Sequence, residues 1–117
     1  MFEIEFYRTE KGKIPVEEFI DSLDVKMQGK VLRTIGLLIE HGTRIGEPYS
    51  SRLAKGIFEL RVQQANNISR ILYFFVRDQK VILTHGFIKK TQKTPPEEIT
   101  RAERYKADYE RRHKNDE

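Results

Sequence analysis

The sequence contains no cysteine, and this absence excludes disulfide bonds, thiolate nucleophiles and cysteine-ligated zinc together. It also suits a reducing compartment, so we expect a cytoplasmic protein. Only three histidines occur, and neither an H-x-x-x-H pair nor an EF-hand or phosphate-cradling glycine loop is found. We therefore expect no metal site and no cofactor.

Long hydrophobic runs are missing as well. No apolar stretch approaches the length that spans a bilayer, and the first residues alternate like a strand rather than forming a secretory leader, so we expect no membrane association. With 117 residues, 38% of them hydrophobic and 34% charged, the chain has room for one small core. We predict a single domain over residues 1–110 and a disordered tail over 111–117.

Positive charge is concentrated in the middle of the chain. Between Arg52 and Lys93, nine lysine or arginine residues stand against two acids, which gives this segment a net charge of +7. Residues 1–51 and 94–117 carry −2 and −1, and the whole chain carries +4. A focused positive field attracts a polyanion better than a diffuse one, so the central segment is the candidate nucleic-acid surface.

The first half of the chain predicts a strand followed by an α-hairpin. Residues 2–7 alternate between apolar and polar, which is the period of a half-buried strand. Pro15 precedes two glutamates and is typical of the first turn of a helix, which we extend to about Leu23. Asp24 can cap a second helix that ends before Gly42. One side of this helix is apolar: Met27, Val31, Ile35, Leu38 and Ile39.

The second half predicts a three-stranded meander and a C-terminal helix. Runs rich in Val, Ile, Phe and Tyr over 57–62, 68–77 and 80–88 are separated by short polar breaks. Thr94-Pro95-Pro96-Glu97 resembles a capping box that opens a helix toward Arg112. We predict an α+β fold in which a small antiparallel sheet, built from the N-terminal strand and the meander, packs against the α-hairpin.

The turn lengths predict which side chains share a face of the meander. With a two-residue turn at Asp78-Gln79 and a four-residue loop at 64–67, Arg61 faces Arg70 on the neighbouring strand. A largely polar face then collects Glu59, Arg61, Arg70, Leu72, His85, Phe87 and Lys89. The opposite face is apolar and would accept the α-hairpin: Phe58, Leu60, Val62, Ile71, Tyr73, Phe75, Ile82 and Ile88.

Two arginines placed opposite each other repel, so their pairing calls for an explanation. One interpretation is an ordinary salt-bridge network in which Glu59 neutralises one of the charges. The other is a phosphate site, because phosphate oxygens accept the paired donors of guanidinium groups. Phe87, Tyr73 or Phe58 could offer a surface for base stacking, although core packing is the simpler role for each of them.

The sequence resembles the RelE/HigB superfamily of toxins from type II toxin-antitoxin systems, in particular its phage-derived, HigB-like branch. Four segments carry the resemblance: Pro15–Phe19 (PVEEF), Leu53–Arg61 (LAKGIFELR), Arg70–Tyr73 (RILY) and His85–Pro95 (HGFIKKTQKTP). The resemblance implies a RelE-like fold and a metal-free, ribosome-dependent endoribonuclease that cuts messenger RNA and inhibits translation. It also implies a helix-turn-helix antitoxin as partner, through which contact with DNA would be indirect.

The resemblance assigns roles to several residues of the positive segment. Arg61 and Arg70 match the strand arginines that bind and stabilise the phosphate. Lys89 or Lys90 matches the basic residue used in proton transfer or charge stabilisation, and Lys89 is our preferred candidate. A lysine among arginines has its charged form disfavoured, which suits such a role. We predict further RNA contacts from Lys55, His85, Phe87, Lys90 and Lys93.

Other activities on the same scaffold stay open. Some related HigB toxins use a histidine and an acid, and here those roles would fall on His85 and Glu59, outside the matching motif positions. ParE-like relatives bind DNA gyrase without cutting RNA, so a non-nuclease toxin is the first alternative. A non-catalytic regulatory partner of a helix-turn-helix protein is the second.

Overall fold

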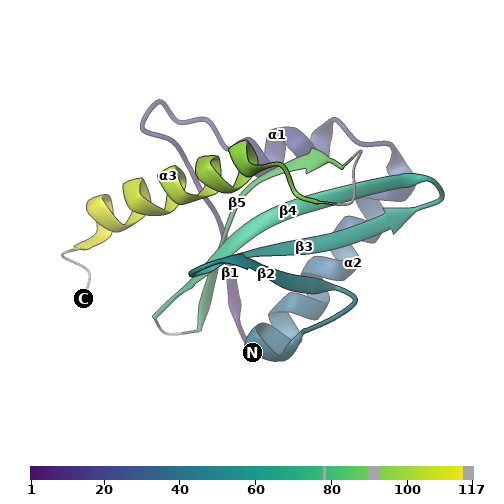
Figure 1. Ribbon diagram of the computed structural model, residues 1–117, viewed down its shortest axis with the longest axis horizontal. Coiled ribbons are helices and arrows are strands. Elements are labelled where there is room, and N and C mark those ends of the chain that lie inside the picture. The colour runs from purple at the N-terminus through teal and green to yellow at the C-terminus, as the bar shows by residue number, and fades with distance from the viewer. Residues whose placement is uncertain (78, 90–92, 115–117) are drawn as a thin grey trace.

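The computed structural model describes residues 1–77, 79–89 and 93–114, which form a five-stranded sheet with helices on both faces (Figure 1). In chain order the elements are β1 (Glu3–Phe6), α1 (Pro15–Asp21), α2 (Val25–His41), a 3-10 turn η1 (Gly42–Arg44), β2 (Ser50–Ala54), β3 (Ile57–Gln64), β4 (Asn67–Val76), β5 (Lys80–Ile88) and α3 (Pro96–His113). The predicted α+β class, α-hairpin, meander and C-terminal helix are confirmed.

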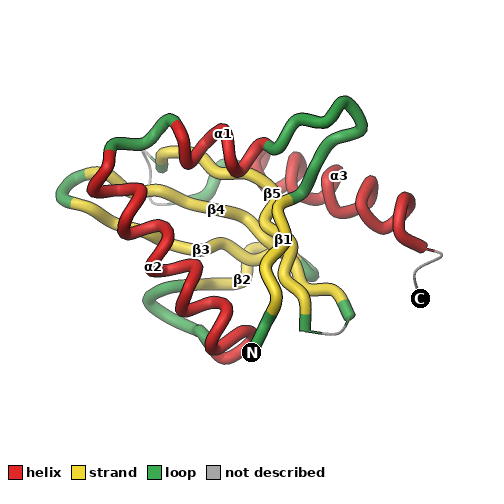
Figure 2. The backbone as a smooth tube through the Cα atoms, turned by 180° about the vertical axis from the view of Figure 1, so that it is seen from behind, coloured by secondary structure: helices red, strands yellow, loops and turns green. Residues whose placement is uncertain are grey.

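The sheet is mixed rather than antiparallel, with strand order β1-β5-β4-β3-β2. β1 pairs in parallel with β5, so the prediction of an all-antiparallel sheet is wrong in this detail. Alternation along a strand predicts which side chains share a face, but it carries no information about the direction of the neighbouring strand. The helices α1 and α2 lie together on one face of the sheet, with α1 against β5 and α2 against β3 (Figure 2).

The edge strand β2 was not predicted from the sequence. Its five residues, SSRLA, show no regular alternation, and its pairing with β3 shifts register between Arg52 and Ala54. The strand exists because β3 offers it a backbone partner, which is a tertiary effect rather than a local propensity. β2 covers β3 only as far as the pair Ser50 and Leu60.

The α-hairpin closes one face of the sheet with hydrocarbon. The Asp24 carboxylate accepts a hydrogen bond from the Met27 amide at 2.8 Å, which confirms the predicted cap. The apolar side of α2 packs in one cluster with side chains from three strands: Leu60 and Val62 of β3, Ile71 and Tyr73 of β4, and Val81 and Leu83 of β5. On α1, the ring of Phe19 lies so close to the Gly86 backbone that a Cβ there would be 2.2 Å from it. Glycine at 86 is therefore required by this helix-strand contact.

The predicted register holds between β3 and β4 and changes once between β4 and β5. Arg61 pairs with Arg70, and Arg70 with Phe87, as expected. Val76 pairs with Lys80, so the turn is one residue longer than predicted, and a bulge at Thr84 restores the register beyond it. Between the turn and the bulge, the side chains of β5 point to the faces opposite to those predicted. Ile82 therefore packs on the α3 side of the sheet rather than beneath the α-hairpin.

The helix α3 covers part of the opposite face of the sheet (Figure 1). A second apolar cluster lies beneath it: Tyr7, Ile57, Leu72, Phe74, Ile82, Ala102 and Tyr109. The predicted capping box is wrong, because Pro95 takes the capping position and the Thr94 hydroxyl bonds to Glu59 instead. Residues 111–113, expected to begin the tail, are helical. None of the described helices has the length and apolarity needed to cross a bilayer.

Candidate functional site

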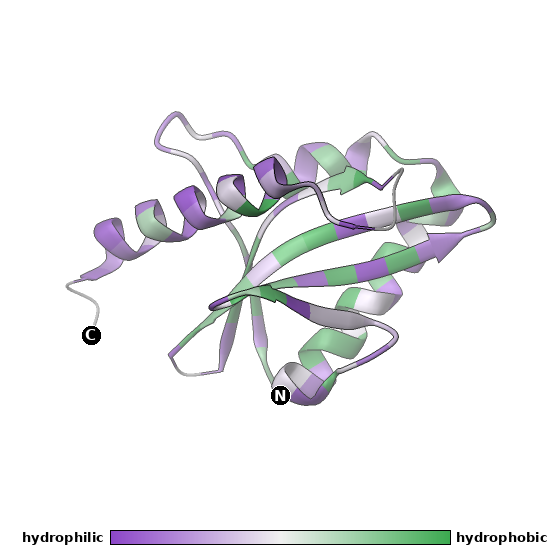
Figure 3. Cartoon of the chain, viewed as in Figure 1, coloured by the Kyte–Doolittle hydropathy of each residue, from purple (hydrophilic) through white to green (hydrophobic). Residues whose placement is uncertain are grey.

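Four charged side chains come together at one end of the α3 face of the sheet. Glu59 and Arg61 are two residues apart on β3 and share a face, and Arg70 lies opposite Arg61 on β4. Lys89 follows β5, where its amide donates to the Ile68 carbonyl at 2.7 Å and continues the pairing beyond the strand. The alternation of hydropathy that produces this arrangement is visible along β3 (Figure 3). We call these four residues the arginine cluster.

The Glu59 carboxylate is the centre of the arginine cluster. Its side chain is 1% exposed. Oε2 accepts a hydrogen bond from Arg61 Nε at 3.0 Å and lies 3.5 Å from Arg70 Nε. Oε1 accepts from the Thr94 hydroxyl at 2.5 Å. A carboxylate this deeply buried requires such partners, because desolvation without them is costly.

Arg61 is the accessible member of the cluster. Its side chain is 32% exposed and makes three interactions with different groups. Besides Nε on Glu59, Nη1 donates to Glu47 at 2.6 Å and Nη2 to the Ser51 hydroxyl at 3.0 Å. The Glu47 side chain is 68% exposed, so this outer ion pair is in water and can exchange for another anion at little cost.

Arg70 is held more deeply, and its hydrogen bonding is incomplete. Only 11% of its side chain is exposed, and Nη1 donates to the Ser69 carbonyl at 3.3 Å. The buried Nε has no hydrogen-bond partner within the described part of the chain. Burial lowers the pKa of Arg70, and nearby Arg61 lowers it further, while Glu59 opposes both. Its Nε faces the Glu59 carboxylate as an ion pair, so Glu59 holds Arg70 in place beside Arg61.

The cluster changes the acidity of its two titratable members. Burial alone would raise the pKa of Glu59. The hydrogen bonds from Thr94 and Arg61 and the charges of Arg70 and Lys89 outweigh burial and lower that pKa, so Glu59 is a carboxylate at neutral pH. Lys89 is 8% exposed. Burial and the two arginines lower its pKa, with Glu59 acting against them.

His85 lies beneath α3 rather than on an open surface. It is 1% exposed, and its Nε2 lies 3.0 Å from Glu98 Oε1 while its Nδ1 lies 3.1 Å from the Thr84 hydroxyl. Burial, with Arg101 nearby, lowers the pKa of His85 to about 3. The ring is therefore neutral at pH 7 and donates from Nε2 to Glu98. A direct RNA contact by His85 would require α3 to move.

The other predicted RNA contacts are dispersed. Phe87 is half-buried and stacks on His85 with ring centroids 6.2 Å apart. Lys55 is exposed in the turn between β2 and β3, at the opposite end of β3 from Arg61. Lys93 is exposed just before α3, and Lys90 lies outside the described residues. Of the alternative stacking rings, Tyr73 is 1% exposed and Phe58 packs against the core beneath the α-hairpin.

Sequence reasoning missed three groups that complete the site. Ser51 and Glu47 reach Arg61 from the strand β2 and the loop before it, and Thr94 reaches Glu59 from 35 residues away. The TPP sequence at 94–96 did draw attention to Thr94, but as a helix cap. Within residues 1–77, 79–89 and 93–114, no group of three or more His, Cys, Asp or Glu side chains could hold a metal ion.

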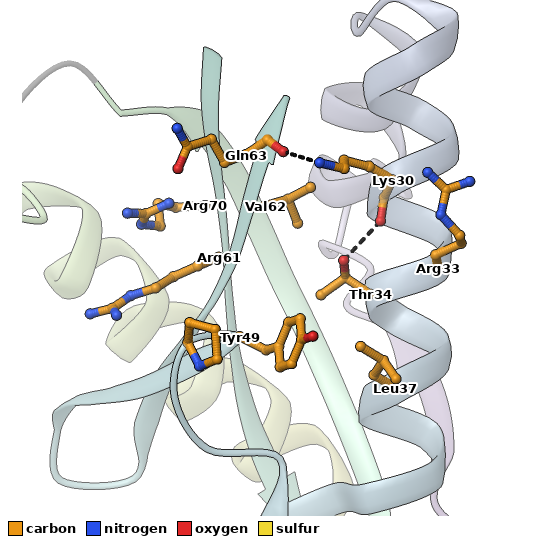
Figure 4. A pocket seen from close by; sticks show the side chains of 10 residues that line it. Lys30, Arg33, Thr34, Leu37, Tyr49, Arg61, Val62, Gln63 and Arg70 are labelled. Atoms are coloured by element: carbon orange, nitrogen blue, oxygen red, sulfur yellow. Dashed lines mark hydrogen bonds between the residues drawn. The ribbon is translucent and has the colours of Figure 1, made fainter. Parts of the chain in front are cut away.

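The exposed side of the cluster opens into a groove of about 780 Å³ between β3 and α2 (Figure 4). Arg61 and Arg70 lie at one end of this groove, and Lys30 and Arg33 of α2 line it as well. An anion that approaches the arginine cluster therefore meets further positive charge beside it.

Comparison with known proteins identifies a family. Among curated proteins no relative matches the sequence. The family model described as "Phage derived protein Gp49-like (DUF891)" matches residues 18–107, which include the end of α1, all of α2, β2 to β5 and most of α3. This family is part of the RelE/HigB-like group of toxins from toxin-antitoxin systems. The chain belongs to the Gp49-like family of phage-derived proteins.

Proposed function

We propose that this protein is the toxin of a toxin-antitoxin pair and that it cuts messenger RNA on the ribosome as a metal-free endoribonuclease. The observation that carries the proposal is the arginine cluster, in which three cations converge on a single buried carboxylate. Two of them, Arg61 and Arg70, are directly opposite on neighbouring strands, an arrangement that repels unless an anion lies between them.

Metal-free cleavage of RNA requires groups that bind the phosphate, stabilise its added charge and transfer protons. The ribose 2′-hydroxyl attacks the adjacent phosphate, a cyclic 2′,3′-phosphate forms, and the bond to the 5′-oxygen of the next nucleotide breaks. The proton of the 2′-hydroxyl must leave, and the departing 5′-oxygen must gain one. Between these events the phosphorane carries additional negative charge, which fixed cations stabilise.

We assign the roles from accessibility and acidity. Arg61 exchanges its exposed partner Glu47 for a phosphate oxygen, and Arg70, which lines the same groove, adds the charge of a second guanidinium. Burial and the neighbouring arginines lower the pKa of Lys89, which makes its proton easier to release, so we assign the proton transfer to Lys89. Glu59 orients both arginines before the substrate arrives.

The test is to induce the protein in cells that lack an antitoxin and to map new 5′ ends on messenger RNA. We expect cuts within translated codons for the wild type and none for the double variant Arg61→Ala, Arg70→Ala. Arg77→Ala is the matched control, because it removes an exposed arginine at the far end of β4. Because Arg70 is buried, the single variant Arg61→Ala and the circular dichroism of each variant separate lost chemistry from lost folding.

Two outcomes would contradict the proposal. Unchanged cutting in the folded Arg61→Ala, Arg70→Ala variant would exclude the arginine cluster as the active site. Growth arrest with intact messenger RNA would point instead to a target such as DNA gyrase, and an absence of any toxicity would favour a regulatory partner of a helix-turn-helix protein.

A further inference from the structure

The groove beside the arginine cluster crosses the free edge of β3. Because β2 pairs with β3 only as far as Leu60, the end of β3 beyond it is not covered by a strand. In Figure 4, Val62 projects toward α2, whereas Arg61 and Arg70 project to the other side of the sheet. The groove therefore connects the α2 side of the molecule with the face that carries the cluster.

The groove has positive charge on both of its sides. Two cations of the cluster belong to its sheet side and Lys30 and Arg33 to its α2 side, and none of the described residues that line it is acidic (Figure 4). The Lys30 ammonium donates to the Gln63 carbonyl at 2.7 Å, so it is held at the edge of the strand. A chain of negative charges spaced along a backbone matches this distribution better than a single small anion does.

An exposed aromatic ring lies between these cations. Tyr49 lines the groove and is 43% exposed, and its backbone carbonyl accepts a hydrogen bond from the Arg61 amide at 2.7 Å. The backbone of Tyr49 is thus tied to the strand that carries the cluster. Aromatic rings within a positively charged groove are the usual means of binding single-stranded nucleic acid, because every base has a face that can stack.

We propose that this groove binds the single-stranded RNA next to the phosphate that is cut, with Lys30 and Arg33 on backbone phosphates and Tyr49 stacked on a base. The inference rests on the proposed function, since the cluster at the end of the groove is the proposed cleavage site. Continuity with Arg61 favours RNA over an acidic protein segment, because one RNA strand would then occupy both the groove and the cluster.

The experiment is to measure binding of a short, fluorescently labelled 2′-O-methyl RNA, which cannot be cut because its attacking hydroxyl is blocked. Fluorescence anisotropy over a range of salt concentrations gives the affinity and its salt dependence. We expect Tyr49→Ala to weaken binding about tenfold. Lys30→Ala with Arg33→Ala should lower the slope of log K against log salt by about 1.4, which corresponds to two phosphate contacts on a single strand. Lys26→Ala, on the exposed first turn of α2, is the control.

The outcomes separate this inference from the proposed function. If cutting depends on Arg61 and Arg70 in cells but the groove variants bind the RNA with unchanged affinity and salt slope, the groove is not the RNA path and the cleavage site stands. Wild-type protein that does not bind the RNA would also overturn the inference. If the groove variants bind RNA normally and lose an acidic protein partner, the groove is a protein-docking surface.

Discussion

The two faces of the sheet are closed in different ways. The face beneath α1 and α2 is closed by hydrocarbon, with Leu38, Leu60 and Ile71 fully buried. The face toward α3 is apolar only where the helix lies on it, and at its other end it carries the arginine cluster. The first face buries apolar side chains, whereas the second buries charges that a simple core would exclude.

The difference between the two faces lies in the free-energy cost of burying charge, which only the α3 face carries. A buried carboxylate with cations around it contributes little stability compared with well-packed apolar side chains, yet removing one partner leaves the others uncompensated. A single substitution in the cluster should therefore destabilise this end of the sheet, although the intact cluster adds little to the free energy of unfolding. This is the pattern expected where a site, rather than packing, determines which residues are present.

The largest effect on stability is expected from the face beneath the α-hairpin. Leu38→Ala removes a side chain that is fully buried and should lower the free energy of unfolding by about 2–5 kcal/mol. Chemical denaturation measures this change. Leu32→Ala, on the same helix but 59% exposed, should stay within about 0.5 kcal/mol. Equal losses in the two variants would contradict the assignment of α2 as the helix that closes this face.

A loss that reaches less far than the upper end of that range is expected from the cluster, and it should depend on pH. Glu59→Gln leaves the surrounding cations without their shared anion and should lower the free energy of unfolding by about 3 kcal/mol at pH 7. Because the folded-state pKa of Glu59 is lowered from 4.5, its contribution is complete above that value and is lost as pH falls through the folded pKa. The difference in free energy of unfolding between the wild type and Glu59→Gln should therefore become smaller at acidic pH.

Denaturation at pH 7 and at pH 3 tests this expectation. Glu40→Gln, an exposed acid on α2, is the matched control and should show no such narrowing. A difference between wild type and Glu59→Gln that is the same at both pH values would mean that Glu59 is not held as a carboxylate by the cluster.

The smallest effect is expected at the far end of α3. The Tyr7 hydroxyl donates to the Asp108 carboxylate at 2.5 Å, and burial together with this acid raises the pKa of Tyr7 to about 12. Tyr7→Phe should lower the free energy of unfolding by about 1 kcal/mol. In a double-mutant cycle with Asp108→Asn, the two losses should not add, because both variants remove the same hydrogen bond. Full additivity would show that this contact does not dock α3.

Much of the cluster could be predicted because its members are close in sequence. Arg61 and Arg70 are joined by one hairpin, and the alternation of β3 and β4 determines which of their side chains share a face. The position of Ile82 could not be predicted, because the longer turn and the bulge at Thr84 are backbone choices with no clear sequence pattern. The two departures compensate, which is why His85 and Phe87 were nevertheless placed on the correct face.

All the helices and strands other than β2, the capped α-hairpin and the pairing of the two arginines follow from the sequence, because they depend on local periodicity and on short connections. Only the tertiary structure decided the direction of β1, the existence of β2, the burial of His85 and the hydrogen bond from Thr94 to Glu59. The groove also depends on the tertiary structure. The pairing of β2 with β3 reaches only to Leu60, and α2 lies beside the part of β3 that β2 leaves uncovered. Such features arise from contacts between distant segments, and these depend on how whole elements pack rather than on the residues of any one of them.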